Sequence, residues 1–440
     1  MTLSAPALPL ERTPVGVRVL AHAPDLAVGA ALAWWATYLT WGTGGREPHV
    51  LSVGCALLAA AYVAVRPWRV VGPVPTALVH AVALGAWAVV LTAPTGWAGG
   101  DEVAAYTLAA ELGLVTWAWA TDAVRRYVVL AAVLGAAGAQ FAAGWLPWWG
   151  AQDPGKLFQG TFYWHNQAGI FLAAGAVLGC AAVAAGRPVA LLGWTVTPLC
   201  VAGTVYTTSR GSQIALALGV VMLLALLRTR RLQVLVTLAL SWGITWLLTG
   251  PPFFAERVSP TASTEARSAS FVGNGTQRLE DWRRAAKIFE HWPFSGAGFN
   301  SFDSAARVAT TPRDDVRTAF AHNGYLQAAA DGGLVLIVPL VALLAVVSWR
   351  VLRGLPADPV RAGGASALLA LLLHSGMDFD WGYPSLLALL GPVAALALPL
   401  PVRGDRGRWD LPLAALGVGL LVVAVWSGWA GGLDLSTPVS

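Results

Sequence analysis

The segment TQRLEDWRRAAKIFEHW, residues 276–292, lies within the only long polar interval of this chain, residues 250–323. Apolar sequence on both sides divides the chain into an N-terminal part, 1–249, a polar connection, 250–322, and a C-terminal part, 323–440. The interval holds nine Lys and Arg residues against eight Asp and Glu, which leaves a net charge of only +1. It is therefore not a general polyanion-binding surface, and its function must depend on particular residues.

Residues 276–292 have the pattern of an amphipathic helix that Asn274 or Thr276 caps and Pro293 ends. At 100° per residue, one face is apolar and is formed by Leu279, Trp282, Ala285, Ala286, Phe289 and Trp292. The opposite face is polar and is formed by Glu280, Asp281, Arg283, Arg284, Lys287 and His291. Arg278 lies on the apolar face, where a cation needs an anionic partner from the protein or from a ligand. A structural salt bridge and a snorkelling arginine are the alternatives for Arg278.

The composition is that of a polytopic membrane protein, with 56% hydrophobic residues, 12% charged residues and a mean hydropathy of +0.62. The net charge of +5 comes from arginines at the ends of apolar segments and does not indicate a nucleic-acid partner. The three cysteines lie inside apolar segments and lack metal-ligand spacing. We expect an all-α fold whose partners include membrane lipids.

Thirteen apolar segments predict membrane-spanning helices. They are residues 26–42, 50–65, 74–93, 104–121, 128–146, 165–186, 189–206, 212–227, 232–249, 323–349, 363–375, 385–401 and 411–430. Several are short for a span, so we expect tilted or broken helices among them. The predicted fold is thus a bundle of about 12–13 transmembrane helices, about nine before the polar connection and about four after it, with one large outer helical loop.

The distribution of basic residues orients these spans. If the N-terminus is cytoplasmic and the spans alternate, the inner segments hold sixteen arginines, whereas the short outer segments hold only Arg46, Lys156 and Arg210. This strong asymmetry follows the positive-inside rule. It predicts that the 250–322 loop and the C-terminus lie outside.

Polar side chains gather at the outer ends of the predicted spans. Arg210 opens one span, Arg278 lies on the loop helix and His322 precedes another span. Two arginines suit a lipid-linked phosphate or diphosphate, and a neutral histidine can accept a proton from a hydroxyl. His165 and Asn166 lie at the mouth of a span, where helix capping and ligand contact are both open. His374, Asp378 and Asp380 form the only group among the outer segments whose spacing approaches that of a metal site.

The order of these motifs resembles the O-antigen ligase/polymerase family. The matching motifs are Ser209-Arg210-Gly211, Arg278-x-x-x-Trp282, Pro293-Phe294-Ser295-Gly296-Ala297-Gly298-x-x-x-Phe302, Ala321-His322-Asn323-Gly324-Tyr325-Leu326-Gln327 and Asp331-Gly332-Gly333. Further motifs extend the resemblance to about residues 155–385. Upstream of the motifs above lie Gly160-Thr161-Phe162 and Asn166, and downstream of them lie His374-Ser375 and Asp378-Phe379-Asp380. Asp331 departs from the glutamate expected at its position.

The resemblance implies a glycosyltransferase of GT-C-like architecture that is inverting and needs no metal or other cofactor. Such enzymes move a glycan from undecaprenyl diphosphate to a lipid- or glycan-bearing acceptor at the outer (periplasmic) face of the bacterial inner membrane, in lipopolysaccharide or polysaccharide biosynthesis. His322, Arg278 and Arg210 are then the expected catalytic residues. The expected substrate contacts are Arg210, Arg278, Asn323, His165, Asn166, Trp282 and Asp378.

Several alternatives stay open at this point. A ligase, a chain-elongating polymerase and a protein O-oligosaccharyltransferase share these motifs. A lipid-linked glycan transporter, or flippase, would explain the spans and the outer arginines without catalysis. A transporter predicts ionisable residues along a path through the membrane, and the few within the spans here are His80 and Glu111.

Overall fold

The computed structural model describes residues 15–432 except 42–43, 46, 96–98, 151–156, 258–263, 311–318, 356–357, 402–406 and 408. All regular structure in these residues is helical. The helices of the N-terminal part are α1 (Val15–Trp34), η1 (Trp35–Leu39), α2 (Pro48–Val65), α3 (Pro67–Val70), α4 (Pro73–Thr92), α5 (Gly100–Trp119), α6 (Ala123–Gly150), α7 (His165–Ala185), α8 (Ala190–Tyr206), α9 (Arg210–Leu226) and α10 (Arg231–Arg257). They are followed by α11 (Thr264–His291), α12 (Phe302–Ala309), α13 (Gly324–Arg353), α14 (Pro359–Ser375), η3 (Asp380–Gly382), α15 (Pro384–Ala397) and α16 (Asp410–Gly432).

Each of the thirteen predicted spans falls on a helix of its own, which confirms the all-α polytopic membrane fold. Among the described residues, seven helices are long and apolar enough to cross a membrane. The total of 12–13 spans stays a prediction. Proline opens several of these helices, because a first-turn residue needs no N–H donor; the examples are Pro48, Pro73, Pro359 and Pro384.

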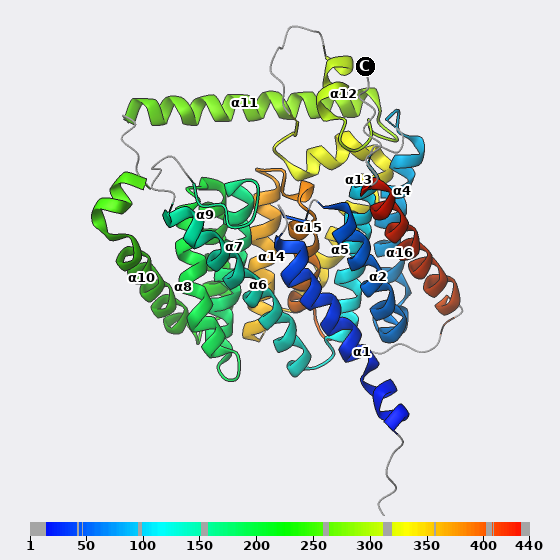
Figure 1. Ribbon diagram of the computed structural model, residues 1–440, viewed down its shortest axis with the longest axis horizontal. Helices are drawn as coiled ribbons and strands as arrows, with labels where there is room; N and C mark the ends of the chain where they lie inside the picture. Colours follow the sequence, from blue (N-terminus) through cyan, green and yellow to red (C-terminus); the bar gives the residue numbers. More distant parts are fainter. Residues whose placement is uncertain are drawn as a thin grey trace, which may run out of the picture.

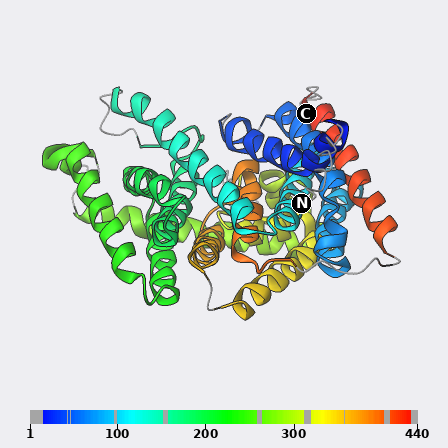
Figure 2. The same ribbon diagram turned by 90° about the horizontal axis from the view of Figure 1, so that it is seen from below.

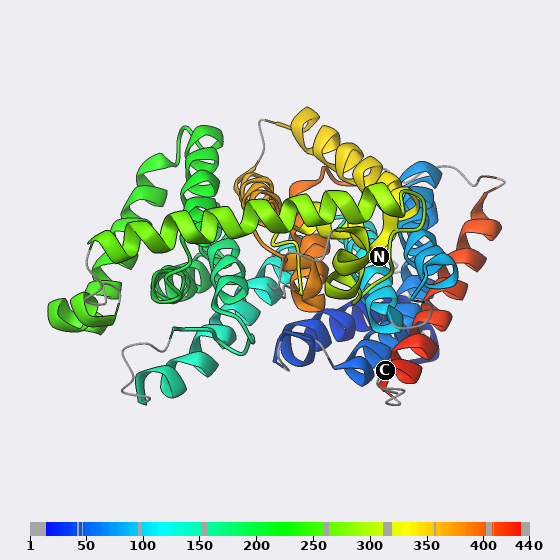
Figure 3. The ribbon, with the colours of Figure 1, turned by 90° about the horizontal axis from the view of Figure 1, so that it is seen from above.

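The apolar helices stand side by side, and α11 lies across one end of the bundle (Figure 1). Seen from above, α11 runs along much of the length of the molecule (Figure 3), whereas the view from below shows the opposite ends of the bundle helices (Figure 2). In Figure 1, α1 starts at the end of the bundle away from α11, and α16 finishes on the α11 side. The predicted placement of the N-terminus inside and the C-terminus outside the membrane stays a prediction.

The helix α7 is the most enclosed of the apolar helices. Nearly its whole length is buried, because its glycines and alanines allow close approach of α8, α9 and α14. At Gly169, a Cβ atom would lie 2.6 Å from Ser212 Oγ, so only glycine fits between α7 and α9 there. This packing fixes the N-terminal end of α7, which carries His165 and Asn166.

The helix α11 differs from its prediction in length and in its buried face. It begins at Thr264 instead of residue 276, and it ends at His291. We expected Asp281 and Arg284 to face solvent, and this was wrong: both are buried, and Arg284 Nη1 lies 3.4 Å from Asp281 Oδ1. The buried face contains this ion pair because each charge compensates the other one turn along the helix. Leu279, expected on the buried face, is 52% exposed.

One of the two predicted domain boundaries falls within a helix, and the other lies just before one. The helix α10 continues past residue 249 to Arg257, and α13 starts at Gly324. The α13 backbone breaks at Gly333, where φ is +54° and ψ is −154°. The predicted 323–349 span is therefore a broken helix.

The segment that joins α11 to α12 fills the break in α13. The N–H groups of Ala297 and Gly298 donate to the carbonyls of Ala330 and Asp331 at 2.9 Å. A Cβ on Gly296 would lie only 2.2 Å from the Asp331 carbonyl oxygen, and the φ of +66° at Gly296 also favours glycine. The 293–298 turn thus locks α11 onto the start of α13, next to His322.

Candidate functional site

The carboxylate of Asp378 is the centre of a polar cluster on the α11 side of the bundle. Asp378 lies between α14 and η3 and is buried. Its Oδ2 accepts a hydrogen bond from Asn166 Nδ2 at 2.7 Å and lies 3.5 Å from Arg278 Nη2. Its Oδ1 lies 3.3 Å from His322 Nδ1 and accepts the N–H of Phe379 at 2.9 Å. One carboxylate therefore joins α7, α11, the start of α13 and the end of α14.

This environment keeps Asp378 ionised. Burial alone would raise the pKa of its carboxyl group, but the hydrogen bond from His322 and the charges of His374, His322 and Arg278 lower that pKa to about 2. The lowered pKa stabilises the fold at every pH above the ordinary carboxyl value, and this stabilisation is lost as the pH falls through about 2. Asp378 is thus a fixed negative charge throughout the neutral range.

His322 is held in a strained but well-supported conformation. Its φ is +49°, in the left-handed region that non-glycine residues seldom adopt. Its ring meets Phe379 edge to face at 5.2 Å, and its carbonyl oxygen lies 3.5 Å from Trp282 Nε1. Because Nδ1 faces Asp378, Nε2 points away from the carboxylate, and 29% of the side chain is exposed. The imidazole can therefore exchange a proton with a molecule on the open side.

Asn323 positions the segment that follows His322. Its Oδ1 accepts the N–H groups of Tyr325 and Leu326 at 3.1 Å, which caps the start of α13. Its Nδ2 donates to the Gly376 carbonyl at 2.9 Å, which ties α13 to the turn before Asp378. Both ends of the Asn323 amide thus bind the protein backbone.

Arg278 reaches the cluster from α11, as expected for a cation on the inner face of that helix. It meets Asp378 through one terminal nitrogen, and 36% of its side chain stays exposed. The protein itself therefore supplies an anionic partner for Arg278, the carboxylate of Asp378. The 3.5 Å separation from a single nitrogen is looser than a bidentate arginine–carboxylate pair.

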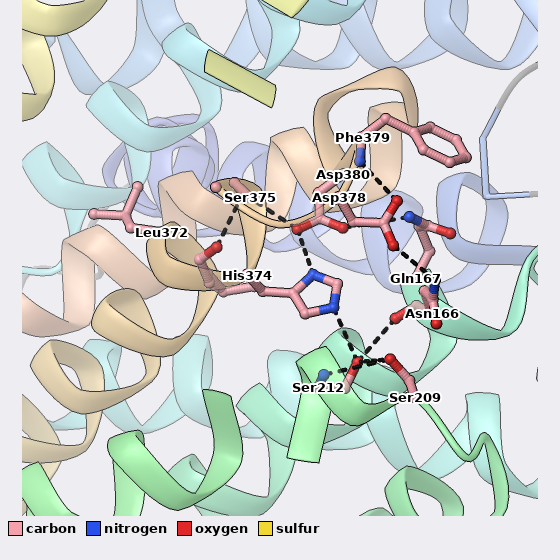
Figure 4. Close-up of polar contacts among 12 residues, drawn as sticks. Asn166, Gln167, Ser209, Ser212, Leu372, His374, Ser375, Asp378, Phe379 and Asp380 are labelled. Carbon is pink, nitrogen blue, oxygen red and sulfur yellow. Dashed lines mark hydrogen bonds and ion pairs between the residues drawn. The ribbon is translucent and has the colours of Figure 1, made fainter. Parts of the chain in front are cut away.

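A second, fully buried cluster lies beneath the first, around His374 (Figure 4). His374 Nδ1 lies 2.8 Å from Asp380 Oδ2, and its Nε2 lies 3.1 Å from Ser212 Oγ. Ser375 Oγ also donates to Asp380 Oδ2, at 3.2 Å. The sequence did not single out Ser212 as a site residue. The feature of the sequence that could have indicated Ser212 was its position two residues after Arg210.

This second cluster supports the turn that carries Arg210. Ser209 caps α9 by accepting the N–H of Ser212, and Arg210 is the first residue of that helix, with an exposed side chain. A Cβ on Gly211 would lie 3.2 Å from the His374 ring, so the backbone beside Arg210 packs against that imidazole. His165 Nδ1 lies 2.8 Å from the Thr207 carbonyl oxygen and so braces the same turn. Neither His165 nor Trp164, the N-cap residue, caps α7 through its side chain.

The predicted site residues therefore fall into three groups. Arg278, His322 and Asn166 contact Asp378 directly, whereas Trp282 and Asn323 hold the backbone around His322. His165 and Arg210 belong to the neighbouring 206–210 turn. Residues from five helices, α7, α9, α11, α13 and α14, thus contribute to a single region of the structure.

The His374 cluster is not arranged as a metal site. Both ring nitrogens of His374 are in hydrogen-bond contact with Asp380 and Ser212, so neither is available to a cation. Across the described residues, no group of three His, Cys, Asp or Glu side chains has an arrangement that could hold a metal ion. The expectation of metal-independent chemistry stays a prediction.

Comparison with known proteins identifies the central third of the chain. A family model described as O-antigen ligase matches residues 196–341. The match contains Arg210, Arg278 and His322 and ends before Asp378 and His374. A search of curated proteins found no match. Residues 196–341 are therefore similar to an O-antigen ligase domain, and they form part of an all-α polytopic membrane protein.

Proposed function

We propose that this protein is a glycosyltransferase that moves a glycan from undecaprenyl diphosphate to an acceptor hydroxyl at the outer face of the bacterial inner membrane. The observation that carries the proposal is the contact of His322 and Arg278 with one buried, ionised carboxylate, Asp378. A carboxylate-oriented imidazole is suited to general base catalysis, and an arginine beside it is suited to a phosphate.

In the proposed reaction, His322 Nε2 accepts the proton of the acceptor hydroxyl. The hydroxyl oxygen then forms a bond to the anomeric carbon of the donor sugar, while the bond from that carbon to the diphosphate oxygen breaks. The electron pair of that bond leaves with undecaprenyl diphosphate. Attack from the side opposite to the leaving group inverts the anomeric centre. Asp378 orients Nδ1 of His322 and stabilises the imidazolium that forms, as an aspartate does in other carboxylate–histidine pairs.

In this scheme, arginine side chains supply the positive charge that a metal ion would otherwise supply to the diphosphate. The leaving diphosphate gains negative charge as the glycosidic bond breaks, and preorganised donors lower the energy of that state. Arg278 retains exposed guanidinium surface beside His322, and Arg210 stands exposed at the start of α9. We assign both arginines to the diphosphate. Asn166, Asn323 and His165 are assigned to positioning, because their side chains contact Asp378 and backbone carbonyl or amide groups.

A transporter gains less support from the residues inside the bundle. His80 Nδ1 lies 2.7 Å from Glu111 Oε1, and its Nε2 lies 3.0 Å from the Tyr62 hydroxyl. All three side chains are fully buried, and they form an interior hydrogen-bonded group. They are thus engaged with one another, away from the exposed arginines.

The test is a transfer assay with purified protein in lipid vesicles. It supplies an undecaprenyl-diphosphate-linked glycan and three candidate acceptors: lipid A core, a growing polysaccharide and an acceptor protein. We expect equal amounts of extended acceptor and released undecaprenyl diphosphate, with no loss of rate in EDTA. The acceptor that is extended separates a ligase, a polymerase and a protein O-oligosaccharyltransferase. Movement of intact glycolipid across the bilayer without cleavage would instead support a transporter, and a rate that EDTA abolishes and Mg²⁺ restores would refute the metal-free mechanism.

A further inference from the structure

A cavity lies beside the proposed catalytic residues, and its lining differs in chemistry from the Asp378 cluster. It opens between the start of α5, the segment around Phe299 and Asn300, the start of α13 and η3, and its volume is about 140 Å³. We name it the α5–η3 pocket and define it by six of its lining residues: Glu102, Tyr106, Asp303, Phe320, Asp331 and Trp381.

The pocket shares a wall with the segment that carries His322. Phe320 and Phe379 stack in parallel with centroids 4.3 Å apart, and the His322 ring meets the edge of the same Phe379. Gln327, another lining residue, accepts the N–H of Ala321 and donates to Asp331 at 2.9 and 3.0 Å. A molecule in the pocket would therefore lie within one aromatic layer of His322.

The lining combines carboxylates with aromatic faces. Glu102, Asp303 and Asp331 are the acidic groups in it, and Asp101 lines the adjoining hollow, which shares Glu102, Tyr106 and Trp381. Among the described residues, the lining contains no Lys or Arg that could pair with a diphosphate. Carboxylate oxygens accept hydrogen bonds from hydroxyl groups, and aromatic rings pack against apolar C–H surface. The pocket is thus suited to a polyhydroxylated, uncharged ligand.

Trp381 supplies an independent sign of a ligand. Its side chain is only 6% exposed, yet among the described residues its Nε1–H has no hydrogen-bond partner. The ring is fixed by Tyr325, which meets it edge to face at 4.7 Å, and by Gly324, where a Cβ would lie 3.0 Å from the ring. Because buried indole N–H groups usually have a partner, a donor held rigidly in the lining of a cavity points to an acceptor atom supplied from outside the protein.

We propose that the α5–η3 pocket binds an uncharged sugar ring, with Trp381 Nε1 donating to a ring substituent and Glu102 accepting from a hydroxyl. The proposal rests on the proposed function for the identity of the substrate as a glycan. The sugar belongs either to the acceptor or to the donor glycan, since both present the same chemistry next to His322.

Binding can be tested without any transfer reaction. The probes are methyl α-D-glucoside, methyl β-D-galactoside and methyl α-D-mannoside, observed by saturation-transfer difference NMR on the full-length protein in nanodiscs. Trp381→Phe keeps the ring and removes the N–H, and Glu102→Gln replaces the carboxyl group with an amide. Trp35→Phe is the matched control, because it also removes a buried indole N–H without a partner among the described residues but does not line the pocket.

We expect at least one probe to give a signal with wild type and with Trp35→Phe, and about a tenfold weaker affinity with each pocket variant. Equal signals from all four proteins, or none with wild type, overturn the proposal. In the transfer assay, a raised KM for the acceptor alone assigns the pocket to the acceptor, and a raised KM for the donor alone assigns it to the donor glycan. Sugar binding without transfer by wild type would refute the proposed function and leave the pocket standing. Transfer by wild type with unchanged KM values in the pocket variants would refute sugar binding in the pocket and leave the proposed function standing.

Discussion

Arg278 illustrates how a single side chain can serve both the fold and a substrate. It meets Asp378 through one nitrogen and keeps 36% of its side chain exposed, so it can turn part of its guanidinium group to a diphosphate. We predict that Arg278→Lys lowers the transfer rate nearly as much as Arg278→Ala, about a hundredfold. The reason is that lysine keeps the charge but loses the planar set of donors.

The matched control for this prediction is Arg283, five residues further along α11. Its side chain is exposed, and removing an exposed charge changes the energy by roughly 0–1 kcal/mol. Transfer rates at equal expression should therefore be nearly unaffected by Arg283→Ala. Equal losses in the Arg278 and Arg283 variants would mean that α11 acts through its general charge, and the assignment of Arg278 would fail.

At the scale of the helix, Arg284 is expected to stabilise α11. It is buried with Asp281, and removing one member of a buried pair typically costs on the order of 3–5 kcal/mol. We predict that Arg284→Ala lowers the midpoint of thermal unfolding and speeds proteolysis within α11, whereas Arg283→Ala does neither. Identical melting curves for the two variants would show that the Arg284–Asp281 pair does not hold the helix in place.

The 293–298 turn gives a second prediction at this scale. Gly296→Ala would force a Cβ against the Asp331 carbonyl and place alanine at a positive φ, which we expect to destabilise the protein by about 1–3 kcal/mol. Gly275→Ala in α11 is the control, because its Cβ would meet nothing within 4 Å and alanine favours a helix. The measurement is thermal unfolding of both variants. A Gly296→Ala protein as stable as Gly275→Ala would remove the proposed lock between α11 and α13.

The sequence was a better guide to the elements than to their contacts. Apolar length and turn residues were enough to predict thirteen helical segments, and the position of Arg278 correctly predicted an inward-facing cation. The same periodicity placed Arg284 on the solvent face, because a helical pattern cannot anticipate that Asp281 will neutralise a buried arginine. Likewise, the glycines of the 293–298 turn were visible, but the break at Gly333 that they fill depends on contacts far apart in the chain.

The cluster around Asp378 shows the same limit at the site. Shared placement on one side of the predicted membrane brought Arg278, His322 and Asp378 into consideration together. It could not predict that Asp378 would be their common partner, or that His374 would bond to Ser212 and not to a ligand. Trp381 carried no signal in the sequence, because only its burial in a cavity reveals an N–H without a partner among the described residues.

For the whole molecule, the distribution of arginines predicts the orientation in the membrane. Thr229 lies in the exposed turn between α9 and α10, and residue 268 lies in α11, on the opposite side of the bundle. We expect a cysteine at position 268 to react with an impermeant thiol reagent in intact cells, and one at position 229 to react only after the membrane is opened. The native Cys55, Cys180 and Cys200 are buried and should not react with the reagent. Reaction at position 229 from outside would overturn the topology.

The central claim is that His322, oriented by Asp378, is the base of glycan transfer. The most direct measurement is the single-turnover rate of transfer by His322→Gln. The control is His291→Gln, since His291 is exposed at the end of α11 and its ring packs against Trp292, away from Asp378. The account predicts a loss of about 10²–10⁴-fold for His322→Gln and an unchanged rate for His291→Gln, with donor binding intact in both. A His322→Gln enzyme that transfers glycan at the wild-type rate would contradict it.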